Sequence, residues 1–511
     1  MATRPRLADG WRWSRSKLLG RRSSPSRSTL LTALVAVTLS ALVGVAMVRL
    51  GTAQRELKAL LIMVAAVAMV VAALRPQVGL TILLILMPFE FHFSGTGTNE
   101  VVVVAMALVL VWRINASAIP GWIAVGGGAL VLGSFIAAIG AHDHTGALWG
   151  AMRWLAAIVL LFAAISVFRG NRDASRRMVD IFTGSALVVV LFAFAQRAGV
   201  YTLVGPPYFS GHPNSFFGVY TVYAGYTAMA AVLATGEVLI AVNQRRMTRA
   251  GMYGAALVVI LIGIAISTSR GGLLALAGGW LFLLVLNFRR GTVVMQACAI
   301  LFIFLAAGYL ATPRSTIVTI QERLSVQSSA DVEDKTRFAL QKAGEQALGA
   351  HPFGLGYENF PFYLREHVHS AFIQMVFDHA HETPVQIGLD AGWLGLVGFL
   401  ILWGWPILKV LTHGRGGGPS AVRATAFAAA LGGFMAQGLF DYLFYEIDFL
   451  IFFVAMVWGA IHALSVDRAT APTRLPRLLP LLDGDRGERG ERRAGGVVAV
   501  HVAEAPTAVV V

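Results

Sequence analysis

Apolar runs about as long as a bilayer is thick recur from residue 30 to residue 466, and short polar segments separate them. Such runs predict transmembrane helices, because a helix needs about 20 mostly apolar residues to cross the hydrocarbon core. The pattern places these helices at roughly 30–48, 57–74, 77–92, 101–114, 119–139, 153–168, 178–199, 217–242, 252–268, 272–288, 293–311, 385–410, 424–442 and 447–465. We therefore expect an all-α polytopic membrane protein with about 12–14 transmembrane helices.

The Lys and Arg residues fall in alternate loops, as expected when cytoplasmic loops are basic. The predicted outer loops FSGTGTNE, AHDHTGALWG, VGPPYFSGHPNSF and DYLFYEID contain neither residue. The first outer loop is an exception, with Arg49 and Arg55, but the more basic N-terminal tail outweighs it. With a cytoplasmic N-terminus, the predicted inner loops contain Arg169, Arg172, Arg176, Arg177, Arg245, Arg246, Arg249, Arg289, Arg290, Lys409, Arg415 and Arg423. We expect a multi-pass protein of the inner membrane with both termini in the cytoplasm.

Three regions follow from this pattern. Residues 1–28 form a basic cytoplasmic tail, residues 29–466 the polytopic membrane domain, and residues 467–511 a flexible cytoplasmic tail rich in Pro, Gly and charge. The apolar run from Thr29 is too long for a cleaved signal peptide, so a retained helix is predicted. One long loop, 312–384, faces outward; within it, 331–350 predicts a surface helix that lies on the membrane or covers a cavity, and 351–360 predicts a Gly-rich turn.

Composition supports the membrane assignment and excludes several functions. The chain is 57% hydrophobic and 13% charged, with a mean hydropathy of +0.69, which a soluble globular protein does not show. The net charge of +14 follows from loop placement and not from a basic face interleaved with aromatics, so no nucleic-acid partner is expected. The single cysteine, Cys298, excludes a disulfide framework and a cysteine metal site within one chain.

The stretch ISTSRGGLLAL (266–276) places Arg270 between two apolar runs at the predicted outer face. An arginine at a membrane boundary is costly without an anionic partner, and its guanidinium group suits two-point contact with phosphate. A snorkelling arginine at a short turn explains the same pattern equally well. Ser269, directly before it, is a candidate to contact the same ligand.

Two further arginines lie in the long loop, Arg337 in DKTRFALQ and Arg365 in FYLREHVHS. Each taken alone is a solvated surface charge, because the loop is polar. A functional role for Arg337 or Arg365 is considered only in combination with other residues. The GxG of HPFGLG has no preceding strand, so a dinucleotide or Walker interpretation fails.

The stretch HAHETPVQIGLDAGWLGL (379–396) places His381 before a strongly apolar run. Thr383 as N-cap and Gln386 three residues later predict a helix start here. The positive end of that helix disfavours imidazolium and helps to keep His381 neutral and able to accept a proton. Asp378 and Glu382 act in the opposite direction.

A metal site is an alternative for the same histidines. His379 and His381, joined by His367 and His369, have spacing compatible with zinc in an extended segment. The sequence offers no cysteine and no third ligand of the usual spacing, so we expect no metal and no other cofactor.

The predicted outer loop GPPYFSGHPNSFFG (205–218) contains Asn214 just before an apolar run. Capping of the following helix is the simpler role for Asn214. Contact with a sugar hydroxyl is the functional alternative.

Several of these motifs occur together in one known superfamily. Many membrane helices, an outer SRGG, a long loop with an R…HPFGLG pattern and a closing motif starting at a histidine resemble the O-antigen ligases and O-antigen polymerases. The closing motif is matched in spacing by His381, Val385, Asp390, Gly392 and Gly395. The chain departs from the family at Glu382, where Asn is usual. The detailed resemblance covers roughly residues 266–399.

The resemblance implies glycosyl transfer on the outer face of the cytoplasmic membrane, without a nucleotide sugar or a required metal. The donor would be a polyprenyl-pyrophosphate-linked glycan, and the acceptor a glycan or a lipid-linked molecule. Arg270 and Arg337 would hold and stabilise the pyrophosphate leaving group, and His381 would take the proton from the acceptor hydroxyl. Arg365 is a reserve candidate for donor binding, and Asn214 a candidate for sugar contact.

These residues do not distinguish the two activities of the superfamily. A polymerase is favoured because nothing identifies a lipid A acceptor; the alternative is a ligase that attaches finished glycan to lipid A core or to a protein. From another class, a lipid-linked oligosaccharide flippase or other transporter remains open, although a transporter would place charges within its helices and not mainly in loops. A membrane scaffold without activity is a further alternative.

Overall fold

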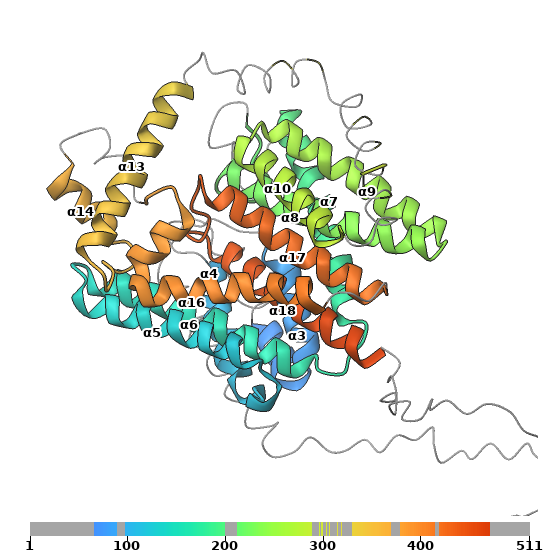
Figure 1. The fold of residues 1–511 in the computed structure, drawn as a ribbon, viewed down its shortest axis with the longest axis horizontal. Coiled ribbons are helices and arrows are strands. Elements are labelled where there is room, and N and C mark those ends of the chain that lie inside the picture. The colour runs from blue at the N-terminus through green and yellow to red at the C-terminus, as the bar shows by residue number, and fades with distance from the viewer. Residues whose placement is uncertain are drawn as a thin grey trace, which may run out of the picture. The chain divides into compact units, whose positions relative to one another are not determined.

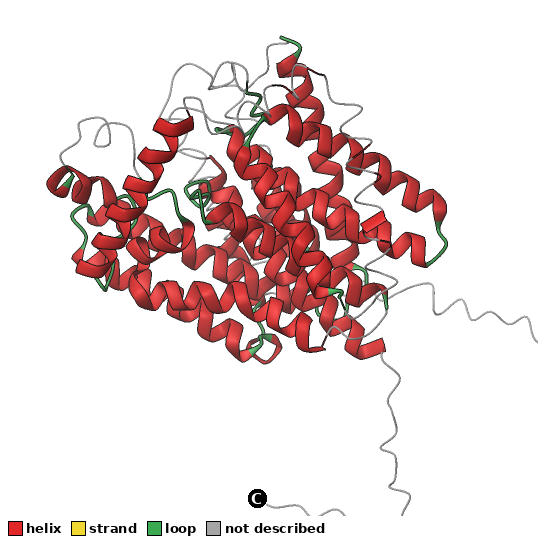
Figure 2. Cartoon of the chain, turned by 45° about the horizontal axis from the view of Figure 1, so that its top comes forward, coloured by secondary structure: helices red, strands yellow, loops and turns green. Residues whose placement is uncertain are grey.

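The computed structural model describes residues 66–88, 98–199, 212–288, 330–368, 379–413 and 418–470, with isolated positions between 296 and 318. Within these ranges every regular element is a helix (Figures 1 and 2). The predicted first span, the first half of the second (57–65), most of the predicted helix 293–311 and both tails (1–28 and, beyond residue 470, the C-terminal one) lie outside the described residues. The elements are α3 (Pro76–Leu86), α4 (Thr98–Leu110), η2 (Val111–Arg113), η3 (Ala116–Ala118), α5 (Gly121–Gly140), α6 (His144–Val167), α7 (Ala174–Arg197), α8 (Tyr220–Asn243), α9 (Met247–Ser267), α10 (Arg270–Leu286), α13 (Ala330–Ala350), α14 (Phe360–His367), α16 (Thr383–His413), α17 (Pro419–Gly438) and α18 (Ile447–Thr470).

The all-α polytopic fold is confirmed by these helices. Seven of those in the described part of the chain are long and apolar enough to cross a membrane: α5, α6, α7, α8, α9, α16 and α18. Each of them begins within a few residues of a predicted span except α6, which starts at His144 because Asp143 caps it, its carboxylate accepting from the N–H groups of Thr145 and Gly146. The protein is therefore a multi-pass membrane protein.

Helix pairs in the bundle approach closely at glycines. A Cβ at Gly133 of α5 would lie 2.3 Å from the carbonyl oxygen of Ala391 in α16, and one at Gly126 would lie 2.9 Å from that of Gly398. Small residues allow such close backbone packing, on which membrane helices rely because lipid supplies little hydrophobic driving force between them. The pair formed by α5 and α16 is thus fixed over much of its length.

Helix α16 is broken at Gly392, whose φ and ψ are 67° and −178°. In an unbroken helix the N–H of Trp393 would donate to the carbonyl of Leu389. Here both groups bond instead to the HPFGLG turn. Trp393 N–H donates to the Pro352 carbonyl at 3.0 Å, and the Leu389 carbonyl accepts from the N–H groups of Leu355 at 2.6 Å and Gly356 at 3.1 Å. The turn after α13 therefore completes the hydrogen bonding of a membrane helix.

The long loop contains the predicted helix. Sequence composition predicts a surface helix at 331–350, and α13 spans Ala330–Ala350. Its apolar side packs on the start of α16 through a small core that includes Leu340, Ala347, Val385 and Leu389. The helix covers a cleft described below, which agrees with one of the two roles expected for it.

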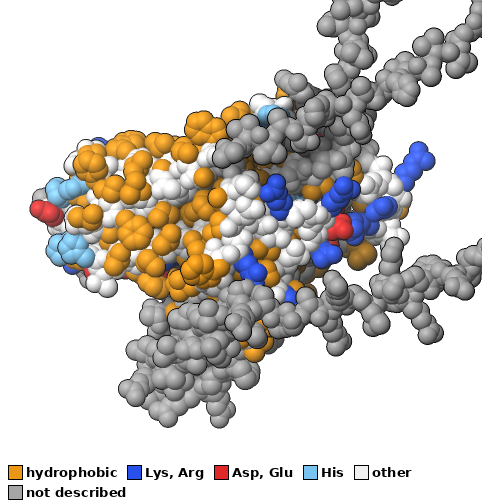
Figure 3. All heavy atoms as spheres, turned by 90° about the horizontal axis from the view of Figure 1, so that it is seen from below, with side chains coloured by type: hydrophobic (Ala, Val, Ile, Leu, Met, Phe, Trp, Pro, Cys, Tyr) orange, Lys and Arg blue, Asp and Glu red, His pale blue; other side chains and the backbone are white. Residues whose placement is uncertain are grey.

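Charged side chains are unevenly distributed over the surface. On the face shown in Figure 3, apolar side chains form a broad belt, most Lys and Arg lie toward one end, and most of the histidine side chains in view lie at the other end. An apolar belt with basic side chains gathered toward one end is typical of a protein that spans a bilayer.

We predict that Gly392→Ala destabilises the protein. The backbone conformation at Gly392 is one that only glycine adopts readily, at a cost of about 1–3 kcal/mol for other residues. In addition, an alanine Cβ would lie 2.7 Å from the carbonyl group of Phe353. The variant should lose several degrees of apparent Tm in detergent, measured by thermal challenge followed by size-exclusion chromatography.

The matched control is Gly404→Ala in the same helix, where a Cβ meets nothing within 4 Å. Equal thermal stability of the two variants would show that the α16 break does not depend on glycine.

Candidate functional site

A cleft of about 320 Å³ opens between the N-terminal ends of α8 and α10, the helix α13 and the segment that follows α17. It brings together three residues singled out from the sequence: Arg270, Ser269 and Arg337. The residues that line it are Tyr220, Thr221, Ser269, Arg270, Gly271, Leu274, Arg337, Phe338, Gln341, Phe440 and Asp441.

The arginines approach the cleft from two elements. Arg270 is the first residue of α10, and Ser269 caps this helix by accepting from the N–H of Gly272 at 3.1 Å. Arg337 comes from α13 and donates to the carbonyl oxygen of Phe440 at 3.3 Å. Both side chains are partly exposed. Two guanidinium groups together with the positive ends of α8 and α10 make this cleft suitable for an anion such as a phosphate.

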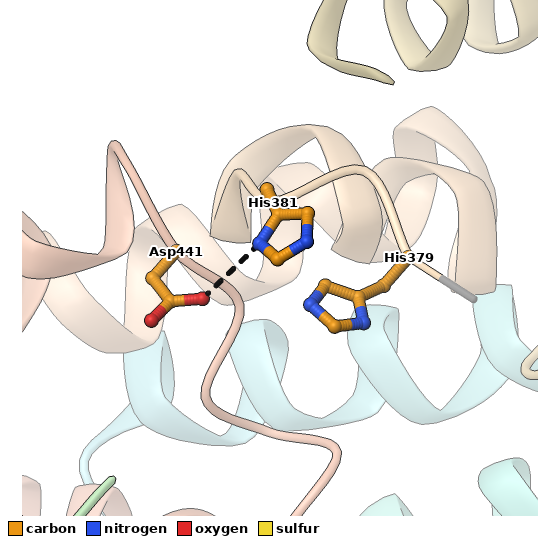
Figure 4. A group of neighbouring side chains, drawn as sticks. All are labelled: His379, His381 and Asp441. Carbon is orange, nitrogen blue, oxygen red and sulfur yellow. Dashed lines mark ion pairs between the residues drawn. The ribbon is translucent and has the colours of Figure 1, made fainter. Parts of the chain in front are cut away.

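His381 lies beside this cleft and pairs with an acid that lines it. The Nδ1 atom of His381 is 3.4 Å from Oδ1 of Asp441 (Figure 4). His381 itself does not line the cleft, but Gln341, which does, donates to the His381 carbonyl oxygen at 3.4 Å. The φ of His381 is 52°, an uncommon value that turns the chain sharply just before α16. The His381 side chain keeps 12% of its surface exposed.

The surroundings favour a neutral His381 and an ionised Asp441. Burial lowers the pKa of His381 below its ordinary value, and the nearby His379 and Arg337 lower it further, although the hydrogen bond with Asp441 acts in the opposite direction. Burial raises the pKa of Asp441, but the hydrogen bond with His381 and the charge of Arg337 outweigh burial and hold this pKa below its ordinary value. The neutral imidazole of His381 therefore lies next to the ionised carboxylate of Asp441.

This geometry revises the expected surroundings of His381. Helix α16 begins at Thr383 as predicted, but Thr383 is its first helical residue and not its cap: its hydroxyl donates to the Asp441 carbonyl at 2.9 Å. The acid that pairs with His381 is Asp441 and not the neighbouring Glu382, whose pKa is raised by burial and by Glu345 of α13. Sequence reasoning missed Asp441, although it opens the predicted outer loop DYLFYEID.

A buried polar network holds both partners of the pair. The Gln386 side chain accepts from Ala380 N–H at 2.8 Å and donates to Asp390 at 2.7 Å. Asp390 in turn accepts from the Tyr442 hydroxyl at 2.9 Å. The residue before His381 and the residue after Asp441 are thus tied to the first turns of α16, and the acid of the closing motif, Asp390, has a positioning role.

Arg153 of α6 fixes the same segment from the other side. Its guanidinium group is buried and donates to the carbonyl oxygens of Phe444 at 3.0 Å and Tyr445 at 2.8 Å. It also donates to the Tyr357 hydroxyl and forms an ion pair with Glu100 at 3.3 Å. Because Tyr357 lies just after the HPFGLG turn, Arg153 links that turn to the segment that carries Asp441. Sequence analysis did not single out Arg153, although this residue opens the predicted span 153–168.

Two expected site residues lie elsewhere. Asn214 is buried, accepts from Gln196 at 3.1 Å and donates to the Gly218 carbonyl at 3.3 Å. It does not cap α8, whose cap position is Val219. Arg365 of α14 lies over the Phe362 ring at 4.7 Å and donates to the Pro361 carbonyl. Neither Asn214 nor Arg365 lines the cleft.

The described helices and the cleft define a polytopic membrane protein with a basic, anion-compatible site at one end of its bundle. Residues 255–400 match the family described as O-antigen ligase (Wzy_C). The match confirms the resemblance predicted from SRGG, HPFGLG and the closing motif, and it supports glycan transfer of the ligase or polymerase type. It includes Arg270, Arg337 and His381, whereas Asp441 lies beyond it. No curated protein matches the chain.

We predict that Arg153→Met lowers the stability of the folded protein. Removing one partner of a buried charged network typically costs about 3–5 kcal/mol, because the remaining groups stay buried without compensation. The yield of monodisperse protein and its apparent Tm in detergent should both fall. Arg172→Met is the control, since Arg172 is exposed; equal stability of the two variants would contradict the role given to Arg153.

Proposed function

We propose that the protein transfers a glycan from a polyprenyl-pyrophosphate carrier to the hydroxyl group of an acceptor glycan on the outer face of the cytoplasmic membrane. The observation that carries the proposal is the single cleft in which Arg270 and Arg337 meet the acid of the His381–Asp441 pair. The family match over residues 255–400 supports glycan transfer of this type.

The arginines supply the positive charge that the leaving group requires. The acceptor oxygen forms a bond to C1 of the donor sugar, the bond from C1 to the pyrophosphate oxygen breaks, and its electron pair leaves with the pyrophosphate. Guanidinium groups stabilise this developing charge when they are already in position. The N-terminal ends of α8 and α10 add partial positive charge at the same cleft. The proposed reaction therefore needs no metal.

His381 acts as the base in this proposal. With Asp441 ionised, Nδ1–H of His381 faces the carboxylate at 3.4 Å, and Nε2, which is buried in this structure, takes the proton of the acceptor hydroxyl once it becomes exposed to the adjoining cleft. Asp441 holds the tautomer and stabilises the imidazolium that forms. The lowered pKa of His381 keeps the ring in its basic form at neutral pH.

Chain extension is the form of the reaction that we favour, with lipid-linked glycan as acceptor. No residue of the cleft points to a lipid A core, which would be the acceptor of a ligase. The two activities differ in what accumulates when the gene is deleted. Single-repeat glycan indicates a polymerase, and long glycan that stays on its lipid carrier indicates a ligase.

We predict that Arg270→Ala and Arg337→Ala each lower transfer about 10²–10³-fold, the usual effect of losing one positioned group that stabilises transition-state charge. The measurement is transfer from a polyprenyl-pyrophosphate donor by the purified variants, with surface glycans of a complemented deletion strain as the cellular readout. Lys342→Ala is the matched control, because Lys342 is an exposed cation of the same helix as Arg337 and does not line the cleft. Full activity of either arginine variant would contradict the proposed leaving-group role.

We predict that activity depends on the neutral form of His381, so the rate should rise with pH and reach its plateau above the lowered pKa of this residue. His381→Ala should lose about 10²–10⁴-fold in rate. Asp441→Asn removes a charge that raises the pKa of His381, so the acid limb of its pH–rate profile should move to lower pH while the maximal rate falls.

The control for the pH profile is Glu382→Gln, which removes an acid next to His381 in sequence without changing the Asp441 pair. An acid limb that stays in place in Asp441→Asn would show that His381 is not the titrating base.

A further inference from the structure

We propose that His379, His381 and Asp441 form a divalent-metal site suited to Zn²⁺, and that the bound ion inhibits the protein. One nitrogen of each histidine and one carboxylate oxygen lie within 4.8 Å of one another. The inhibitory effect rests on the proposed function, because it depends on His381 acting as the base. Binding of the metal does not depend on it.

The geometry is close to that of a zinc site. Zinc holds nitrogen and oxygen ligands at about 2.0–2.2 Å, so neighbouring ligands of a tetrahedral site are about 3.4 Å apart. The 3.4 Å between His381 Nδ1 and Asp441 Oδ1 already matches that spacing. The ring of His379 lies 4.2 Å from that of His381, and its ligand nitrogen lies within 4.8 Å of the other two ligand atoms (Figure 4).

The sequence could not provide this third ligand. His379 and His381 belong to the segment before α16, whereas Asp441 follows α17 and reaches them only in the folded chain. For this reason the zinc interpretation of the HxH spacing lacked a third ligand. His367, considered with them, stacks on Tyr363 at 4.1 Å and is not part of the cluster.

The chemistry of the ligands selects the class of metal. Two imidazoles and one carboxylate suit Zn²⁺ and similar transition metals, whereas Mg²⁺ and Ca²⁺ prefer sites made of oxygen ligands. Three protein ligands leave a fourth position open to water or to a phosphate oxygen from the adjoining cleft. Asp441 belongs both to the proposed set of metal ligands and to the lining of the cleft, since it pairs with His381 and lines the cleft.

Neighbouring groups support the ligands and also limit the affinity. The N–H of Tyr442 donates to Asp441 Oδ1 at 3.0 Å, and the His379 ring stacks on Tyr445 at 5.6 Å, so both side chains are oriented. The charge of Arg337 acts on Asp441 and His381 and opposes a second cation. We therefore expect the site to bind Zn²⁺ less tightly than a structural zinc site does, which suits reversible inhibition.

Metal binding would remove the base whichever nitrogen of His381 it uses. A neutral imidazole has one N–H group and one lone pair. If the ion binds Nδ1, the proton moves to Nε2, and no lone pair faces the acceptor. If the ion binds Nε2, it occupies the position of the acceptor proton directly.

The test uses the full-length protein in detergent after treatment with a chelator. Zn²⁺ should inhibit transfer from the polyprenyl-pyrophosphate donor, EDTA should restore it, and Mg²⁺ at the same concentration should have no effect. Binding is followed independently with Co²⁺, whose visible absorption reports tetrahedral coordination. His379→Gln, measured against its own metal-free rate, should raise the half-inhibitory Zn²⁺ concentration at least about 10-fold and lose the Co²⁺ absorption. His367→Gln is the matched control and should behave as the unmodified protein.

Three results would overturn the proposal: no inhibition by Zn²⁺, equal inhibition of the unmodified protein and His379→Gln, or stimulation by Zn²⁺ after chelation. Failure of the proposed function is distinguishable from failure of the metal site. A metal-free protein without transfer activity would contradict the function, while Co²⁺ binding in the unmodified protein and its loss in His379→Gln would still test the site.

Discussion

The hydrogen bonds exchanged at the break in α16 position the rest of the site. A helix inside a membrane cannot leave backbone groups unsatisfied, since no water is available to bind them. At Gly392 the chain departs from helical geometry, and the groups this releases bond to the turn 351–356. The break and the turn therefore stabilise each other. Because α13 leads directly into this turn, its position over the cleft, and with it that of Arg337, follows from the same contact.

The second half of the site depends on the segment between α17 and α18. Thr383 at the start of α16 donates to the Asp441 carbonyl, and Asp390 accepts from Tyr442. Arg153 donates to the carbonyls of Phe444 and Tyr445. Asp441 is thereby fixed from both sides. Buried polar networks of this kind are rigid when every member is bonded, and such rigidity suits a pair in which a carboxylate must hold one tautomer of an imidazole.

Much of the fold could be predicted from sequence, and the reason is physical. A spanning helix must be apolar over its whole length, so the positions of α5, α7 and α9 follow from hydropathy alone. Arg270 could be selected because charge beside apolar runs is costly, whereas Arg337 was selected only through the family resemblance; both line the cleft. Asp441 could not be selected, because its partners are remote in the chain; Arg153 was not selected, although it opens the predicted span 153–168. Gly392 was matched as a position of the closing motif, but the helix break there was not predicted, since glycine within an apolar run is common at helix contacts.

The ionised Asp441 makes the charge distribution of the cleft asymmetric, which determines where the donor and the acceptor bind in the proposed reaction. A carboxylate repels the pyrophosphate of the donor, and the lowered pKa of Asp441 keeps that negative charge in place at neutral pH. Arg337 compensates part of it, whereas Arg270 lies at the positive end of α10. The pyrophosphate is then most stable near Arg270, and the neutral acceptor hydroxyl is most stable near Asp441 and His381. In the proposed reaction Arg270 thus holds the leaving group and His381 takes the proton, which suits displacement at C1 because the attacking and leaving oxygens lie on opposite sides of that carbon.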